Sequence, residues 1–262
     1  MSENRKFSVL MSVYVKENPA FLEEAVESII HQTLKPSEVV IVEDGPLTPE
    51  LYQVLEKLEA QSSIPIKRCP LEQNRGLGLA LQYGVLQCQY DVIARMDTDD
   101  IAVEDRFEQQ FELMEKENLD LLGGHIAEFI DRPDEIVSYR RVPIKHEDIV
   151  VYQRMRSAFN HMTVMFKKEM VLKAGNYEDG LYMEDDLLWL NMISAGARTG
   201  NVDQILCKVR VGAGMFERRG GLRYLKLYRQ ARKRMQARGQ ISYGEYLKSV
   251  LIQVVVALCP GF

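Results

Sequence analysis

The sequence predicts an α/β fold in which helices flank both faces of a mostly parallel central sheet. Short apolar runs rich in β-branched residues alternate with amphipathic helical patterns about three times in the first part of the chain. Polar residues follow the ends of several of these runs. The 262 residues, 46% hydrophobic and 27% charged, have an ordinary globular composition and suffice for one large domain with a small appendage.

The predicted strands and helices alternate in chain order. Each predicted strand is a short apolar run, and the four runs are FSVLMSVYV (7–15), EVVIVEDG (38–45), IPIKRC (64–69) and YDVIARMD (90–97). The helices after the first two strands begin where Asn18 and Thr48 each precede a proline, because Asn and Thr cap helices and proline fits the first turn. A third helix is expected over residues 74–88, where apolar residues recur at helical spacing.

The pattern changes after residue 100. The sequence then predicts a helix over 104–117, strands within 119–130 and 157–168, a helix over 180–196 that begins with acidic residues, and a C-terminal region that is first basic and then apolar. We therefore divide the chain into a main α/β domain (1–216) and a C-terminal helical extension (217–262).

Polar residues lie where three of the predicted strands end. Tyr14 lies at the end of the first strand, Glu43 and Asp44 at the end of the second, and Asp97, Asp99 and Asp100 at and just after the end of the fourth. Ligands of open parallel sheets bind at the carboxyl ends of the strands. Three neighbouring carboxylates repel one another, and Mg²⁺ or Mn²⁺, which prefers oxygen ligands, would cancel that repulsion. The pattern predicts a divalent-cation site; the alternative is an acidic turn with Asp as a helix cap.

Other features exclude several classes of protein and site. The four cysteines are widely spaced without a CxxC pair, which argues against a structural zinc site or a disulfide framework and favours reduced thiols in the cytosol. The GLG at 76–78 lacks the third glycine and the first-strand position of a dinucleotide fingerprint. No signal-peptide cleavage site follows the first apolar run, and no run reaches the roughly 20 apolar residues that span a membrane.

Charge is uneven along the chain. The net charge is −5; residues 217–262 hold ten Lys or Arg and two acids, so they carry +8 and residues 1–216 carry −13. Basic residues alternate with apolar ones such as Leu222, Tyr228 and Met235, which predicts an amphipathic helix on an anionic membrane surface. We expect a cytoplasmic protein on the inner face of the cell membrane; the acidic main domain argues against nucleic acid. The alternative is a helix packed on the main domain with a solvated basic face.

Five motifs occur in the order seen in family 2 glycosyltransferases: SVLMSVY, VVIVEDGP, NRGLGLAL, RMDTDD and YMEDDLLWL. Residues 7–215 resemble this family, and 159–177 resemble the segment before its catalytic acids. The finer likeness is to bacterial enzymes that build capsule, exopolysaccharide or O-antigen repeat units. The resemblance implies a GT-A nucleotide-diphospho-sugar transferase fold, Mn²⁺ or Mg²⁺, a UDP-sugar donor, a saccharide or polyprenyl-diphosphate-linked saccharide acceptor, and inversion at the transferred sugar.

The resemblance also assigns residues on the donor side. Those implied to approach the nucleotide are Ser12, Tyr14, Asp44, Arg75 and Asp97. Asp44 matches the acid that holds the base, whereas Arg75 either pairs with the nucleotide or caps a solvated helix face. Asp97 and Asp99 match the DxD motif; Asp99 is the expected direct metal ligand, and Asp97 binds the metal or touches the ribose. Asp100 would support either.

On the acceptor side, MEDD matches the family's ED motif. Asp185 is therefore the expected general base, with Glu184 beside it, because an acceptor hydroxyl is a poor nucleophile until a carboxylate takes its proton. If the match to the ED motif is shifted by one residue, Asp186 is the base. Another alternative is that these acids only stabilise the N-terminus of a helix. His161, Trp189 and Arg210 are candidates for contact with the acceptor or the diphosphate, each with an alternative role in the core or on the surface.

Two other functions share part of this pattern. A sugar-phosphate nucleotidyltransferase also combines an α/β sheet with a metal and acids, but SVYVKENPAF (12–21) lacks the Gly-rich basic loop that it should carry after the first strand. A non-catalytic nucleotide-sugar-binding protein would keep Asp44 and the DxD motif without needing Asp185. The intact MEDD favours an enzyme.

Overall fold

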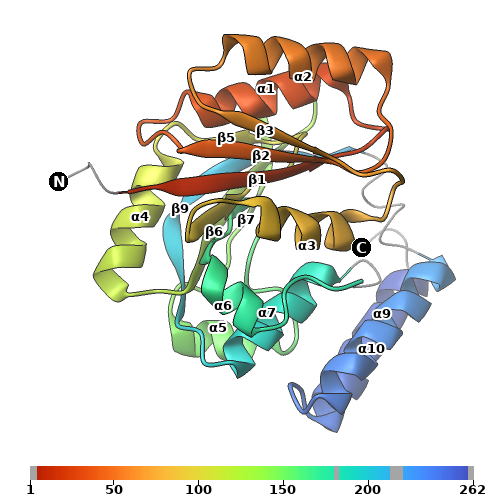
Figure 1. Cartoon of the computed structure of the whole chain (residues 1–262). Coiled ribbons are helices and arrows are strands. Elements are labelled where there is room, and N and C mark those ends of the chain that lie inside the picture. Colours follow the sequence, from red (N-terminus) through yellow and green to blue (C-terminus); the bar gives the residue numbers. More distant parts are fainter. Residues whose placement is uncertain (1–4, 180–182, 213–220, 259–262) are drawn as a thin grey trace.

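The computed structural model describes residues 5–179, 183–212 and 221–258 and confirms the α/β prediction (Figure 1). The strands are β1 (Phe7–Val13), β2 (Glu38–Glu43), β3 (Ile66–Pro70), β4 (Val92–Arg95), β5 (Ile101–Ala102), β6 (Leu121–Phe129), β7 (Ile136–Arg140), β8 (Met165–Lys167) and β9 (Thr199–Arg210). The helices are α1 (Pro19–Ile30), α2 (Pro49–Gln61), α3 (Leu77–Gln87), α4 (Arg106–Glu117), α5 (His146–Gln153), α6 (Lys168–Lys173), α7 (Glu184–Ser194), α9 (Gly221–Ala237) and α10 (Tyr243–Leu258).

The described strands form one sheet in the order β3-β2-β1-β4-β8-β6-β9-β5, with β7 paired to β6. β3, β2, β1 and β4 are parallel, β8 is antiparallel to both of its neighbours, and β6 and β9 are parallel. The chain runs outward from β1 to β3 on one side and then returns to place β4 on the other. The connections therefore diverge between β1 and β4, and ligands of open α/β sheets bind outside the carboxyl ends of strands at such a point.

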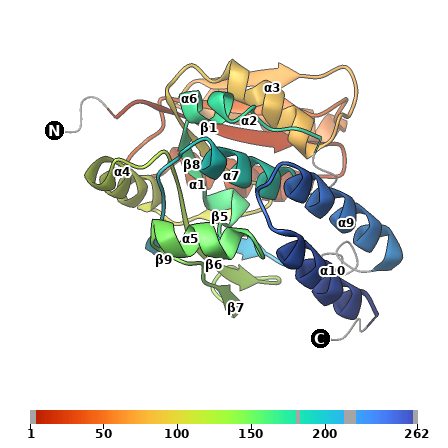
Figure 2. The same ribbon diagram turned by 90° about the horizontal axis from the view of Figure 1, so that it is seen from below.

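Helices cover both faces of the sheet (Figures 1 and 2). Side chains alternate along β1, where Val9 and Met11 pack with α1, α2 and α4 while Leu10 packs with α3 on the opposite face. α5, α6 and α7 contribute buried residues to that second face. Because the middle of the sheet is buried on both sides, a ligand can reach it only at the strand ends.

Several elements differ from the sequence prediction. The strand expected within 157–168 is present only as the short β8, because His161–Thr163 before it form a 3₁₀ turn. The Thr163 hydroxyl donates to the Asn160 carbonyl (2.8 Å), which closes the backbone into that turn. α5, α6, β5, β7 and β9 were not predicted; in β9 the polar residues Asn201 and Asp203 interrupt the apolar pattern.

The predicted C-terminal helical extension forms a helical hairpin, α9 and α10, beside α7 (Figure 2). Leu187 and Leu190 of α7 share an apolar cluster with Ala231 and Met235 of α9. α9 thus packs on the main domain, which agrees with the alternative of a packed helix for this region. The expected boundary at residue 216 lies outside the described residues. Among the helices of the described ranges, none has both the length and the apolar content needed to cross a bilayer.

Candidate active site

The loops after β1 and β4 meet at the carboxyl edge of the sheet. The Thr98 hydroxyl donates to the Ser12 carbonyl (3.5 Å) and to the Glu17 carboxylate (2.5 Å). Ser12 is half-buried and Tyr14 is exposed at this edge. The residues expected near the nucleotide therefore lie where the topology favours ligand binding.

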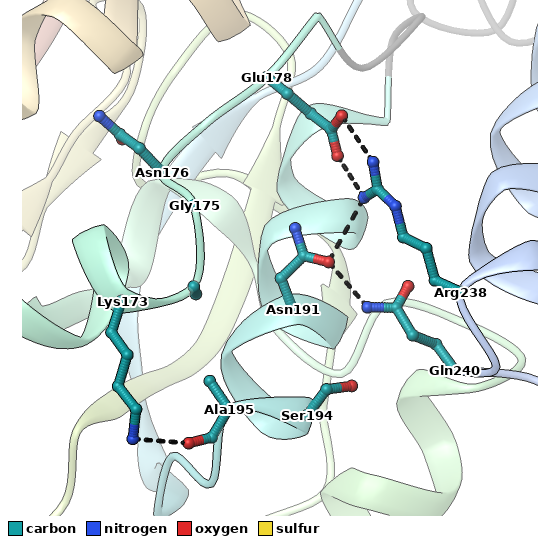
Figure 3. Close-up of a pocket in the computed structure, with 10 residues that line it drawn as sticks. Lys173, Gly175, Asn176, Glu178, Asn191, Ser194, Ala195, Arg238 and Gln240 are labelled. Atoms are coloured by element: carbon teal, nitrogen blue, oxygen red, sulfur yellow. Dashed lines mark hydrogen bonds and ion pairs between the residues drawn. The ribbon is translucent and has the colours of Figure 1, made fainter.

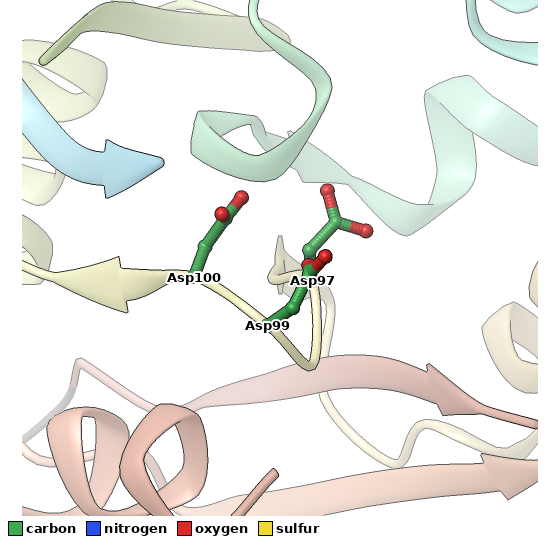
Figure 4. A group of neighbouring side chains, drawn as sticks. All are labelled: Asp97, Asp99 and Asp100. Carbon is green, nitrogen blue, oxygen red and sulfur yellow. The ribbon is translucent and has the colours of Figure 1, made fainter. Parts of the chain in front are cut away.

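Asp97, Asp99 and Asp100 gather in the loop between β4 and β5 (Figure 4). One carboxylate oxygen of each lies within 4.8 Å of the others. Burial, followed by the neighbouring Asp97 and Glu17, raises the pKa of Asp99 to about 7, and burial with the two other Asp residues raises the pKa of Asp100 well above its usual range. A hard divalent cation fits this donor set, because it would find three close oxygens and relieve the repulsion that raises the pKa values.

Arg95 binds the Asp97 carboxylate, and sequence reasoning gave this arginine no role. Both terminal nitrogens of Arg95 donate to Asp97, Nη1 at 2.6 Å, and Arg95 is only 1% exposed. Its charge lowers the pKa of Asp99 and also of Glu184 and Asp185 on α7. Arg95 is therefore a buried cation shared by the strand-end acids and the helix acids. The missed signal was an arginine inside an apolar strand, two residues before an aspartate on the same face.

Arg210, at the end of β9, is held against the same cluster. Its amide donates to Asp100 Oδ1 (3.0 Å), and its guanidinium donates to the Asp99 carbonyl (3.4 Å) and the Glu24 carboxylate (2.6 Å). The guanidinium carbon lies 3.8 Å from the centre of the Phe21 ring. Arg210 is thus fixed beside the acids and is not a generic surface arginine; contact with a diphosphate stays a prediction.

Asp44 joins the end of β2 to the start of α3. Its carboxylate accepts from the amides of Arg75 (2.7 Å) and Gly76 (3.0 Å). Gly45 has a φ of 85°, and a Cβ there would lie 2.6 Å from the Asn74 nitrogen, so only glycine lets the two loops come this close. Asp44 is buried and the Arg75 side chain is exposed. The contact of either residue with a nucleotide stays a prediction.

Glu184, Asp185 and Asp186 form the first turn of α7. The Asp186 carboxylate accepts from Gln153 Nε2 (2.7 Å), which holds it against α5. Burial, followed by Asp186 and Glu184, raises the pKa of Asp185 to about 7. A carboxylate with a pKa near neutrality is suited to take a proton at physiological pH. The role of Asp185 as the general base stays a prediction.

Aromatic residues pack behind the two groups of acids. His161 Nε2 hydrogen-bonds the Tyr177 hydroxyl (2.9 Å), and burial together with Arg95 holds the pKa of His161 well below its usual range. Trp189 is fully buried, with its ring centre 5.7 Å from Phe159 and 6.4 Å from Tyr177. Stacking of Trp189 on an acceptor sugar is therefore wrong for this structure, because its ring does not reach the surface, and the core alternative holds.

Gly78 on α3 packs against the segment that leads to α7. A Cβ at Gly78 would lie 2.5 Å from the Glu178 carbonyl and 3.0 Å from Glu184 Cβ. We expect Gly78→Ala to displace the acids of α7, lower the free energy of unfolding by about 1–3 kcal/mol and reduce turnover. Urea unfolding measures the stability. Gly244→Ala, whose Cβ would meet no atom closer than 3.9 Å, is the control; equal stability of the two variants would contradict the prediction.

A cavity of about 450 Å³ lies apart from these acids, between α6, α7 and the loop after α9 (Figure 3). Arg238 donates to Glu178 (2.5 Å) and Asn191 (3.4 Å) in its wall, and Gln240 donates to Asn191 (2.7 Å). None of the residues predicted for the site lines this cavity. It is therefore distinct from the strand-end site.

Comparison with known proteins finds relatives over most of the chain. Residues 8–173 match the family model described as glycosyl transferase family 2. An uncharacterized glycosyltransferase of Haemophilus influenzae is 46% identical over 84% of this chain and 82% of its own. The amylovoran biosynthesis glycosyltransferase AmsE of Erwinia amylovora is 40% identical over 97% and 94%. The UDP-Gal:alpha-D-GlcNAc-diphosphoundecaprenol beta-1,3-galactosyltransferase of Escherichia coli is 36% identical over 97% and 92%.

Solved structures share the fold. S. aureus TarS 1-349 in complex with UDP-GlcNAc superposes with a TM-score of 0.66 at 18% identity, and the match covers 86% of this chain and 65% of that one. The mannosyltransferase PcManGT of Pyrobaculum calidifontis, in complex with GDP-Man and Mn²⁺, gives 0.65 at 15% identity over 98% and 76%. These matches confirm the GT-A fold.

Proposed function

The chain belongs to glycosyl transferase family 2 and is a glycosyltransferase, and from this premise we propose that it transfers a sugar, with inversion, from a UDP-sugar to a lipid-linked saccharide in bacterial surface polysaccharide assembly. The name of the Escherichia coli relative supports the donor and the acceptor class, and the name of the Erwinia amylovora relative supports a role in polysaccharide biosynthesis. The observation that carries the proposal is the buried Arg95, whose charge acts on acids at the strand ends and on Asp185 of α7. This shared cation supports a single site that contains both acid groups that the reaction needs.

On the donor side, Asp97, Asp99 and Asp100 would hold Mn²⁺ or Mg²⁺. Asp99 would be the principal ligand, because Arg95 already binds Asp97 and the Arg210 amide already binds Asp100. Such a cation stabilises the negative charge that develops on a leaving diphosphate. The residues that would surround the nucleotide are Ser12, Tyr14, Asp44 and Arg75.

On the acceptor side, Asp185 would take the proton of the attacking hydroxyl. The acceptor oxygen then bonds to the anomeric carbon while the bond from that carbon to the diphosphate oxygen breaks, so a single displacement inverts the configuration. Gln153 keeps Asp186 turned toward α5, and Glu184 stays beside the base. An α-linked donor would give a β-linked product.

We expect kcat/KM to rise with pH through about 7. Asp185 must be ionised to accept a proton, and its pKa in the free protein is about 7. Asp186→Asn removes a neighbouring charge that raises this pKa, so the rising limb should move to lower pH, while the new side chain keeps an oxygen for Gln153. Rates between about pH 5 and 9 test this; a limb at the same pH in both proteins would contradict it.

A transfer assay separates this function from the alternatives. The protein with Mn²⁺, a panel of UDP-sugars and a GlcNAc-diphosphate lipid should release UDP and form a disaccharide whose new linkage, by NMR, has the anomeric configuration opposite to the donor. Release of diphosphate from UTP and a sugar 1-phosphate would indicate a nucleotidyltransferase. Binding of UDP-sugars without turnover would indicate a non-catalytic protein.

A further inference from the structure

The outer face of α10 is apolar and exposed. Five large apolar side chains lie along it, and each is at least 42% exposed; they are Leu247, Leu251, Ile252, Val255 and Val256. At 100° per residue they lie on one side of the helix, and the opposite side faces α9 through Tyr246 and Ser249. Monomeric soluble proteins rarely leave such a contiguous surface uncovered.

The same hairpin is strongly cationic. Residues 221–258 contain eight Lys or Arg and one acid, Glu245. Arg234 and Arg238 pair with Glu178 of the main domain, whereas Glu245 accepts from the Ser242 amide (2.6 Å) and lies 3.9 Å from Arg154 of the main domain. Lys226 and Lys233 of α9 are exposed, and Lys248 lies within the apolar arc of α10. A second copy placed symmetrically on this face would bring like charges together, whereas an anionic lipid surface would complement both the charge and the apolar arc.

α9 connects this surface to the catalytic helix. Met183 and Leu187, which flank Asp185 in the chain, pack in the same buried cluster as Ala231 and Met235 of α9. Arg232 of α9 is also buried, and it donates to the Ser249 hydroxyl of α10 (3.1 Å) and to the Arg154 carbonyl of the main domain. A surface bound to α10 would therefore have a fixed position relative to Asp185.

We propose that the α9–α10 hairpin docks on the surface of an anionic lipid bilayer, with the exposed face of α10 in the headgroup region and the basic side chains of α9 on the anionic lipid. This inference deepens the proposed function, because docking would present the saccharide of a lipid-linked acceptor to Asp185. The docking itself does not depend on the identity of donor or acceptor.

Vesicle co-sedimentation tests the docking without any donor or acceptor. The wild-type chain should sediment with vesicles that contain phosphatidylglycerol, and much less with pure phosphatidylcholine. Leu251→Glu/Val255→Glu and Lys226→Glu/Lys233→Glu should each lower the partition coefficient by about tenfold or more. These four side chains are exposed, so the variants should fold. Leu86→Glu changes an equally exposed leucine at the end of α3 and should bind as the wild type does.

Equal sedimentation of the wild type and both double variants, or no sedimentation of the wild type, would overturn the proposal. A dimer in light scattering that Leu251→Glu/Val255→Glu abolishes, together with no vesicle binding, would overturn it and assign the face to a contact between copies. Vesicle binding by a protein that transfers no sugar would sustain the docking and reject the proposed function.

Discussion

Asp185→Asn should lower sugar transfer about 10²–10⁴-fold, the contribution usual for a general base. The amide that replaces the carboxylate cannot accept the acceptor proton. Asp185 is one of three adjacent carboxylates, and burial and like charges raise its pKa. Removing this charge should therefore leave the protein at least as stable as the wild type. Turnover and thermal unfolding, measured on the same preparation, separate chemistry from folding.

Asp186→Asn is the matched control for this variant. Its new side chain keeps the oxygen that accepts from Gln153, so we expect activity within about tenfold of the wild type at the respective optimal pH. A large loss of transfer activity in Asp186→Asn, together with an active Asp185→Asn, would identify Asp186 as the base and contradict the assignment.

Arg95→Met should both destabilise the protein and shift its pH profile. Removing one partner of a buried ion pair typically costs about 3–5 kcal/mol, because the other charge stays buried without compensation. Asp97 would lose both of its hydrogen bonds from Arg95. Arg95 also lowers the pKa of Asp185, so in any folded fraction the rising limb of kcat/KM should move to higher pH. Urea unfolding and the pH profile measure the two effects.

Arg95→Met/Asp97→Asn provides the second test of this pairing. The double variant removes both charges of the pair, so it should recover part of the lost stability while transfer stays low. Arg95→Lys keeps a positive charge and should stay closer to the wild-type pH profile. If Arg95→Met is as stable as the wild type and its kcat/KM rises over the same pH range, Arg95 is not the shared cation.

The strand–helix alternation and the strand-end acids could be predicted because they depend on local patterns. β1 and β2 are short, mainly apolar runs, and the expected starts of α1 and α2 at Pro19 and Pro49 are those observed. The DxD cluster followed from the rule that ligands bind at the carboxyl ends of parallel strands. β9 could not be predicted in this way, because its pairing with β6 is set by a partner far away in the chain.

The role of Arg95 and the burial of Trp189 depend on tertiary packing. Arg95 follows apolar residues in a short strand, and only the fold brings the α7 acids near enough for its charge to act on them. Trp189 follows the acids at helical spacing, which suggested a place at the acceptor, but its side of α7 faces Phe159 and Tyr177 in the core. Residue type and spacing alone did not distinguish these environments.

Thermal unfolding with UDP, with and without Mn²⁺, tests the central claim most directly. UDP at about 100 times its Kd should stabilise the wild type by about 2.7 kcal/mol, which raises Tm by roughly 5–10 °C for a domain of this size, and the shift should require Mn²⁺. Asp99→Asn should lose the shift in Tm, whereas Glu117→Gln, which changes an exposed acid at the C-terminal end of α4, should keep it. A rise in Tm with UDP that does not require Mn²⁺ and that persists in Asp99→Asn would contradict the metal–nucleotide site. No rise in Tm with UDP, GDP or dTDP would contradict the donor assignment as a whole.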